Sequence, residues 1–163
     1  MERLWAPWRI AHLSNPSREK GCIFCNARDA RGEEREHLVL SRSDHSLTMI
    51  NRHPYTSGHL MVVAAQHTAE LNDLSEAELL DLMQGVVRAR ALLREVSHPD
   101  GFNIGTNLGK AAGAAVEDHL HIHVVGRWNG DTNFMTVYAG VRVIPEGLYA
   151  LYDRLSAAIG KGR

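Results

Sequence analysis

The stretch His119-Leu120-His121-Ile122-His123-Val124-Val125 sets the fold prediction for this chain. Three histidines alternate with apolar residues, and alternate side chains of a β-strand point to the same face. We therefore predict a strand over 119–125, with imidazoles on one face and core residues on the other. Three neutral imidazoles on one face can supply a nucleophile, a general base or metal ligands near neutral pH.

Further apolar segments predict a sheet around this strand. Short extended patterns bounded by turn residues predict four more strands, at 37–40, 47–50, 59–64 and 102–108. Together with the histidine strand they indicate an α+β fold, with a mainly antiparallel sheet of about five strands.

One long helix and a short C-terminal helix complete the predicted fold. Ser75 and Glu78 have the spacing of a capping box, and a Pro-Asp-Gly stop signal follows His98, so the long helix should run from Ser75 to about Ser97. The second helix is expected over 146–159. The apolar residues that we expect on the buried face of the long helix are Leu79, Leu82, Met83, Val86, Val87, Leu93 and Val96.

The composition excludes several classes of protein. The chain has 163 residues, of which 44% are hydrophobic and 23% charged, and its formal net charge is −1, so we expect no nucleic-acid partner. No stretch approaches the roughly 20 apolar residues of a membrane span, and the start lacks the apolar core of a signal peptide. We therefore expect a cytoplasmic protein with no membrane partner, in a single domain over 1–163.

The two cysteines, Cys22 and Cys25, form one C-x-x-C motif. We expect a tight knuckle over 21–25, followed by a solvated loop or a short helix over 26–36. In a reducing compartment such a pair indicates metal binding or redox chemistry, with inert thiols as the alternative. A redox pair normally opens a helix after a buried strand, and no strand pattern precedes Gly21, which favours a metal.

The loop before the histidine strand, 109–116, consists mostly of glycine and alanine. Small side chains let backbone N–H groups approach a ligand closely, and phosphate suits such a loop. A nucleophilic imidazole beside an anion-stabilising loop is what attack on phosphorus requires. The loop and the histidines together therefore predict a phosphate site.

These motifs together resemble those of the histidine triad family of nucleotide-binding proteins, and within it the bacterial diadenosine tetraphosphate phosphorylase branch. The resemblance spans most of the chain from Cys22 onward and implies a HIT-like fold. Besides the histidine run it rests on Asn51-Arg52-His53-Pro54-Tyr55, Gly58-His59-Leu60-Met61-Val62-Val63, Asn107-Leu108-Gly109, Ala112-Gly113 and Arg127-Trp128-Asn129-Gly130-Asp131-Thr132-Asn133-Phe134.

The resemblance implies a reaction and its residues. The middle histidine, His121, would attack the α-phosphorus of a nucleoside polyphosphate, and the covalent nucleotidyl-histidine would then pass to phosphate or water. For this chain it implies cleavage of diadenosine tetraphosphate with inorganic phosphate to ATP and ADP. His123 would hydrogen-bond near the scissile phosphate, and Asn51 would hold the ribose unless it only caps a strand turn. The residues implied at the phosphate oxygens are Asn107 and the backbone of Gly113, Ala114 and Ala115.

The resemblance extends to a zinc-binding subset of the family and so implies a structural zinc ion. The ligands it implies are Cys22, Cys25, His67 and His119, a set typical of a closed tetrahedral site. The N-terminal segment, 1–36, would carry this site and be pinned to the catalytic core, 37–163. A homodimer is also implied, because family members usually join two sheets edge to edge.

Several alternatives stay open at this point. The chain could be a hydrolase of dinucleoside polyphosphates or nucleoside phosphoramidates, a non-catalytic zinc-stabilised nucleotide-binding module, or an enzyme whose three histidines hold a catalytic metal. Two positions depart from the family pattern, with Gly126 in place of a proline and Ala115 in place of a serine or threonine that reaches phosphate. On charge and position, the candidates to hold an acceptor phosphate are Lys110, Arg52 and Arg127.

Overall fold

The computed structural model describes residues 21–131, 144 and 146–161. The first 20 residues of the expected N-terminal segment, and positions 132–134 of the motif that begins at Arg127, lie outside the described residues. In the part of the chain that is described, no helix has the length and apolar character needed to cross a bilayer.

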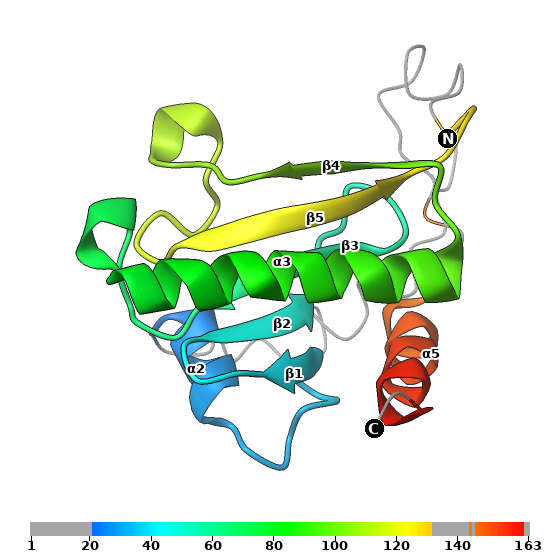
Figure 1. Cartoon of the computed structure of the whole chain (residues 1–163), viewed down its shortest axis with the longest axis horizontal. Coiled ribbons are helices and arrows are strands. Elements are labelled where there is room, and N and C mark those ends of the chain that lie inside the picture. Colours follow the sequence, from blue (N-terminus) through cyan, green and yellow to red (C-terminus); the bar gives the residue numbers. More distant parts are fainter. Residues whose placement is uncertain (1–20, 132–143, 145, 162–163) are drawn as a thin grey trace, which may run out of the picture.

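Five antiparallel strands form one sheet in the order β1-β2-β3-β5-β4 (Figure 1). The predicted α+β fold with a five-stranded sheet is confirmed. The strands are β1 (Val39–Arg42), β2 (Ser46–Ile50), β3 (His59–Ala64), β4 (Gly101–Gly105) and β5 (His121–Arg127).

The strand that carries the histidines begins two residues later than predicted. The Leu120 N–H donates to the Thr68 carbonyl at 2.6 Å, in the loop after β3, instead of joining the ladder of the sheet. The strand therefore starts at His121, and His119 lies just before it. β4 likewise stops at Gly105 rather than at position 108.

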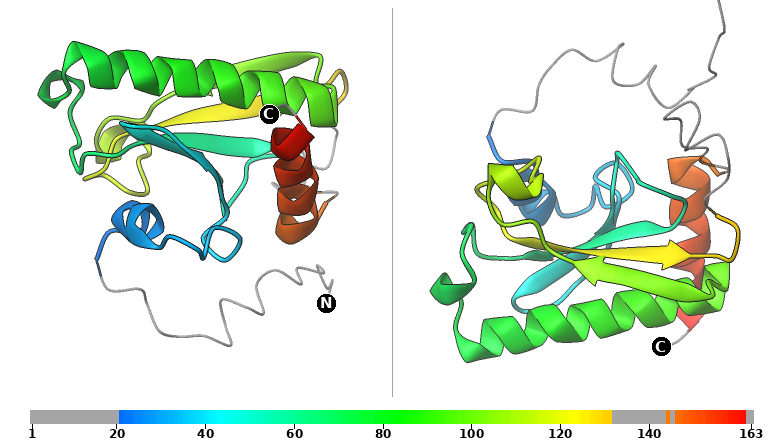
Figure 2. Two further views of the ribbon diagram at one scale, coloured as in Figure 1. Left: turned by 60° about the horizontal axis from the view of Figure 1, so that its bottom comes forward. Right: turned by 90° about the horizontal axis from the view of Figure 1, so that it is seen from above.

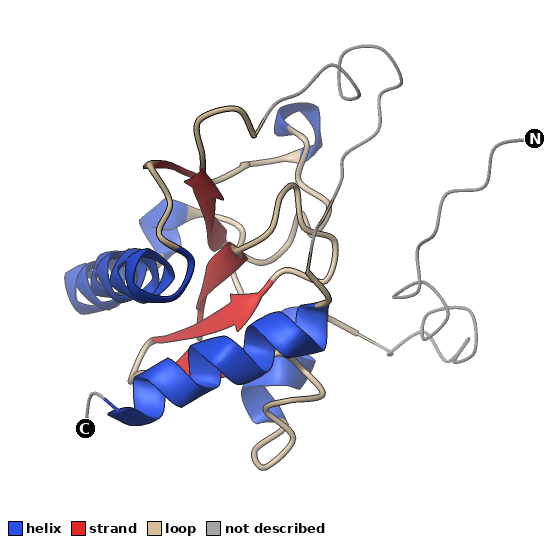
Figure 3. Ribbon diagram, turned by 90° about the vertical axis from the view of Figure 1, so that its right-hand side faces the viewer, coloured by secondary structure: helices blue, strands red, loops and turns tan. Residues whose placement is uncertain are grey.

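Helix α3 (Glu76–Ser97) begins and ends where the sequence predicts, and Figure 3 shows it end-on beside the sheet. The Ser75 hydroxyl accepts a hydrogen bond from the Glu78 N–H at 3.4 Å, and the Glu78 carboxylate accepts one from the Ser75 N–H at 2.8 Å. This reciprocal pair is a capping box, and it satisfies two backbone donors at the helix start.

The buried face of α3 is narrower than predicted. Met83 and Val87 were expected on it, but they are 53% and 64% exposed. Each follows a buried residue by one position, which turns its side chain by about 100° around the helix axis. The buried residues of this helix are Leu82, Gly85, Val86, Ala89 and Leu93.

Helices cover both faces of the sheet (Figure 2). Helix α3 and the C-terminal helix α5 (Leu148–Lys161) share one core with the sheet face that carries Ile122 and Val124. The opposite face of β5 carries His121 and His123, and it is the face on which the short helix α2 (Ile23–Asp29) lies. The apolar and the imidazole positions of the strand therefore face different layers, as the alternation predicts.

Helix α2 replaces the expected knuckle over 21–25. Cys22 precedes the first helical residue, and Cys25 lies in the first turn. The side chains of Phe24 and Ala27 are each 1% exposed and pack into a second core that includes Met61 and Val63. Because no side-chain hydrogen bond caps this helix at Cys22, its tertiary packing is what stabilises it.

Candidate active site and metal centre

The three histidines line up on the sheet face that α2 covers. His119 and His121 are 1% and 5% exposed. The ring centroids of His121 and His123 lie 4.9 Å apart, and the Phe24 ring contacts both His119, at 5.3 Å, and His121, at 4.9 Å. The imidazoles are therefore packed against α2 rather than spread over an open polar surface.

The hydrogen bonds of His121 fix which of its ring nitrogens is free. Its Nδ1 lies 2.8 Å from the carbonyl oxygen of His119, which can only accept, so Nδ1 carries the hydrogen. Burial lowers the pKa of His121 and keeps the ring neutral, because desolvation disfavours the charged form. Nε2 is thus left with a lone pair, as a nucleophile requires.

A fourth histidine, His59, determines which ring nitrogen of His123 carries the hydrogen, and the result is the opposite of that in His121. His59 is fully buried, and its Nδ1 accepts a hydrogen bond from the Tyr55 N–H at 3.1 Å, so its Nε2 carries the hydrogen. That Nε2 lies 2.9 Å from Nδ1 of His123 and donates to it. The hydrogen of neutral His123 therefore sits on Nε2, which makes this nitrogen a donor to whatever lies beside it.

His123 stays neutral over a wide pH range. Burial, together with the neighbouring His121, lowers its pKa to about 4. The site thus pairs a lone-pair nitrogen on His121 with an N–H donor on His123. Sequence reasoning assigned no role to His59, although it lies inside a quoted motif, because its partner is 64 positions away and belongs to the neighbouring strand.

The residues expected at ribose and phosphate lie near the two ends of this row. Asn51 follows β2, and its side-chain oxygen accepts a hydrogen bond from the His53 N–H at 2.8 Å, the geometry of a turn cap. Its amide nitrogen lies 3.4 Å from the His59 ring. Asn51 is half-buried as a residue, so part of it stays accessible to a ligand while its side-chain oxygen caps the turn.

The small-residue loop forms a turn beside the start of β5. A short 3₁₀ helix, η2 (Lys110–Ala112), ends at Gly113, whose φ of 88° suits glycine. The Asn107 side chain donates to the Gly113 carbonyl at 3.5 Å. Ala115 is exposed whereas Ala114 is buried. Asn107 therefore lies beside the loop with which the family resemblance groups it.

Two of the three basic candidates for an acceptor phosphate are engaged elsewhere. Arg127 donates to both carboxylate oxygens of Asp131, at 2.6 and 2.8 Å, and to Asn103 at 2.7 Å, so its charge is compensated within the protein. Arg52 donates to the Glu36 carbonyl at 2.5 Å. Lys110 lies exposed in η2.

The four predicted metal ligands come together between α2 and the start of β5. One ligand atom from each of them lies within 4.8 Å of all the others. The Sγ atom of Cys22 is 3.2 Å from Nδ1 of His119, and Sγ of Cys25 is 3.3 Å from Nδ1 of His67. The two Nδ1 atoms are 3.1 Å apart. Ligands in a tetrahedron around zinc are separated by about 3.3–3.8 Å, so the cluster fits that ion.

The surroundings of the cluster also suit a cation. Nε2 of His119 lies 2.8 Å from the Ala64 carbonyl and must donate to it, so Nδ1 presents a lone pair to the cluster. Burial and the neighbouring Cys22 raise the pKa of the Cys25 thiol, and a bound cation would favour its thiolate form. The cluster has four protein ligands, as a structural zinc site does.

The comparisons with known proteins agree with this geometry. The HIT domain family matches residues 32–130. Over 154 residues the chain is 39% identical to the AP-4-A phosphorylase of Mycobacterium tuberculosis, an alignment that covers 90% of this chain and 78% of that protein. It is 27% identical to adenosine 5'-monophosphoramidase hnt1 of Schizosaccharomyces pombe, over 85% of this chain and 98% of that protein.

A solved structure adds the metal. The Zn-bound histidine triad family protein from Mycobacterium smegmatis superposes with a TM-score of 0.68 at 30% sequence identity, over 86% of this chain and 94% of that chain. The Cys₂His₂ cluster described above therefore suits a structural zinc site. The family match, the similarity to these proteins and the arrangement of the three histidines lead to one conclusion: the chain belongs to the histidine triad (HIT) family.

Proposed function

We propose that this protein is a nucleotidyl transferase that cleaves diadenosine tetraphosphate with inorganic phosphate, giving ATP and ADP. The observation that carries the proposal is the hydrogen bond from His121 Nδ1 to the His119 carbonyl, which leaves Nε2 free to attack phosphorus. The identity to a protein named AP-4-A phosphorylase supports the choice of substrate.

The proposed reaction has two steps. In the first, Nε2 of His121 attacks the α-phosphorus, the bond from this phosphorus to the bridging oxygen breaks, and ATP leaves. The Nε2–H of His123 donates a hydrogen bond to the oxygen that gains charge. In the second step an oxygen of inorganic phosphate attacks the same phosphorus, the P–N bond to His121 breaks, and ADP leaves.

The substrate contacts in this proposal use the residues at the two ends of the histidine row. Asn51 holds the ribose of the transferred nucleotide, and Asn107 with the backbone of Gly113, Ala114 and Ala115 holds phosphate oxygens. Ala115 has no hydroxyl, so its contribution comes from the backbone N–H alone. The zinc ion is structural in this scheme: Cys22, Cys25, His67 and His119 would hold it, and it would fix α2 against the start of β5.

A hydrolase is the second candidate, because the chain also resembles a protein named a phosphoramidase. Water in place of phosphate would give ATP and AMP from diadenosine tetraphosphate. The test is to incubate the purified protein with this substrate, with and without inorganic phosphate, and to separate ATP, ADP and AMP. ATP and ADP that form only with phosphate support the phosphorylase. AMP formed in either condition supports the hydrolase.

A variant pair separates catalysis from binding. His121→Asn should reduce turnover by a factor on the order of 10³ or more, while nucleotide binding persists. His98→Asn is the matched control, because His98 closes α3 in a left-handed conformation that asparagine also adopts. Full binding without any turnover by the unmodified protein would instead support the non-catalytic module.

We also propose a homodimer formed through the free side of β4 and the outer face of α3. Among the described strands β4 is an edge strand, with Ile104 45% exposed. The outer face of α3 presents Leu80, Met83 and Val87, which are 53–64% exposed. Light scattering after size exclusion should show a dimer, and Met83→Glu should shift it toward monomer.

A thiolate pair that binds zinc persists in a reducing compartment, which supports a cytoplasmic location.

A further inference from the structure

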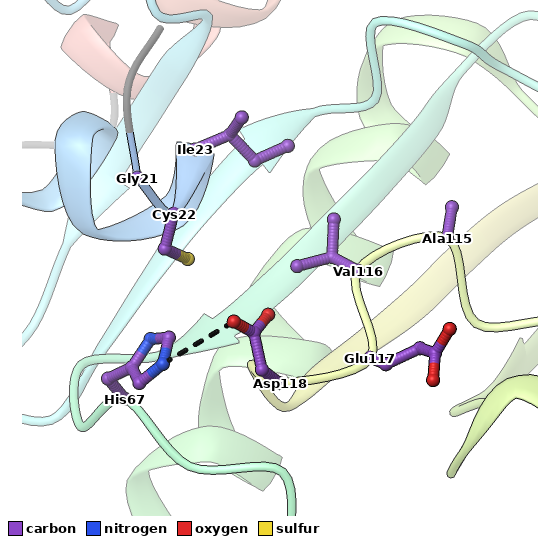
Figure 4. A pocket seen from close by; sticks show the side chains of 8 residues that line it. All are labelled: Gly21, Cys22, Ile23, His67, Ala115, Val116, Glu117 and Asp118. Atoms are coloured by element: carbon purple, nitrogen blue, oxygen red, sulfur yellow. Dashed lines mark ion pairs between the residues drawn. The ribbon is translucent and has the colours of Figure 1, made fainter.

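A cavity lies beside the metal centre, between the start of α2 and the loop that leads into β5 (Figure 4). Its volume is about 420 Å³, within the range of small-molecule sites. Cys22 and Ile23 form one wall, and Val116 and Asp118 form the opposite wall. Among the residues proposed above to contact the substrate, Ala115 lines this space.

The register of the sheet places the cavity at one end of the proposed substrate path. His59 pairs with Val125 at the Asn51 end, and His123 and His121 follow along β5 opposite Met61 and Val63. Beyond them His119 reaches the Ala64 carbonyl at the end of β3. The next position toward the cavity is Asp118, and Ala115 belongs both to the cavity wall and to the proposed phosphate loop. His119 and His121 are covered by Phe24, so the phosphates would leave His121 along the 109–115 loop and reach this cavity at Ala115.

The walls of the cavity suit a nucleoside better than a phosphate. In Figure 4 the carboxylate of Asp118 points into the space, 3.7 Å from Nε2 of His67, and Glu117 also lines it. Carboxylates accept hydrogen bonds from hydroxyl and amino groups and repel phosphate. Ile23, 44% exposed, and Val116 provide apolar contact for a base. A zinc ion held by two thiolates is neutral overall and would not offset the carboxylates.

We propose that this cavity binds the second nucleoside of a dinucleoside polyphosphate, the one that leaves with the polyphosphate. The assignment rests on the proposed function, because it takes the first nucleoside and the phosphates to lie as described there. This arrangement would let the site distinguish dinucleoside from mononucleoside polyphosphates. A dinucleoside polyphosphate places an uncharged nucleoside beside Asp118 and Glu117. A mononucleoside polyphosphate with the same number of phosphates places a charged terminal phosphate there, which the two carboxylates repel.

The test compares two substrates, diadenosine tetraphosphate and adenosine tetraphosphate, on the zinc-loaded protein. The unmodified protein should favour the dinucleotide in kcat/KM. Asp118→Asn should reduce that preference about tenfold, through loss of a charge-assisted hydrogen bond to the dinucleotide and of repulsion toward the mononucleotide. Glu95→Gln on α3, across the sheet, is the matched control and should leave the preference unchanged.

Two further measurements keep the outcome unambiguous. The first is the zinc content of each variant, measured by atomic absorption, because Asp118 also faces the zinc ligand His67. The second is a variant of the apolar wall, Ile23→Ala, which should raise KM for the dinucleotide only. Turnover with an unchanged preference in Asp118→Asn and in Ile23→Ala would overturn the cavity assignment and leave the proposed function standing. No turnover of either substrate by the unmodified protein would overturn both.

Discussion

Phe24 is the side chain through which the metal centre and the nucleophile are packed together, and its removal gives the sharpest test of the structure. Its ring is 1% exposed and contacts both His119 and His121. Truncating a buried phenylalanine to alanine costs about 3–5 kcal/mol of the free energy of unfolding. For a domain of this size each kcal/mol lowers the melting temperature by about 2–4 °C, so Phe24→Ala should melt about 6–20 °C lower.

The same substitution should also slow the reaction. An aromatic contact of this kind contributes about 0.5–1.5 kcal/mol to the placement of its partner ring, which corresponds to a two- to tenfold decrease in kcat at a temperature where the variant is folded. Leu93→Ala is the control: Leu93 is fully buried in the core on the other face of the sheet, so it should lose similar stability and keep its kcat. Thermal melts and steady-state rates would be measured at one fixed zinc concentration. A Phe24→Ala protein that melts less than about 3 °C lower, or that keeps the kcat of the Leu93→Ala control, would refute the reasoning.

Three further predictions concern the histidines and the metal ligands of the site. His59→Phe keeps a buried ring but removes the donor to His123, so kcat should fall about tenfold at a temperature where the variant is folded; a normal kcat would contradict the assigned hydrogen positions. The melting temperature should fall as well, because the hydrogen bond from the Tyr55 N–H is also lost. The pKa of His123 is about 4 in the folded protein and 6.5 in the unfolded chain, so between these pH values the unfolded state binds more protons. The free energy of unfolding should therefore decrease as the pH falls from 6.5 to 4. Urea unfolding should show a smaller decrease for His123→Gln. Cys25→Ser should lose zinc and melt lower, and chelator should inactivate the unmodified protein slowly, in step with metal release, rather than at once.

Features set by local sequence were predictable, and α3 is the clearest of them. Its start depends on Ser75 and Glu78, which lie three residues apart and form the capping box by themselves. The alternation in β5 likewise predicts which residues face the core, because the period of a strand is a local property. The ends of β5 were less predictable, since the position of its first residue depends on a hydrogen bond from Leu120 to the distant Thr68.

Features set by tertiary contacts were missed. Helix α2 has no side-chain hydrogen bond at its N-terminus, and the burial of Phe24 and Ala27 against the sheet stabilises it. The seven residues of α2 contain no pattern that predicts this burial. The role of His59 depends on a partner across the strand pair and on the backbone N–H of Tyr55, and neither can be inferred without the register of β3 and β5.

The three histidines could be joint ligands of a catalytic metal or groups with separate tasks, and the hydrogen bonds around them favour separate tasks. His119 presents its Nδ1 to the cysteines, because its Nε2 must donate to the Ala64 carbonyl. His121 cannot use Nδ1 as a ligand, since that nitrogen carries the hydrogen bonded to the His119 carbonyl. Nδ1 of His123 accepts from His59, which leaves its Nε2 protonated and unable to coordinate an ion. Only Nε2 of His121 keeps a free lone pair, and a single imidazole is poorly suited to hold a catalytic ion but well suited to attack phosphorus.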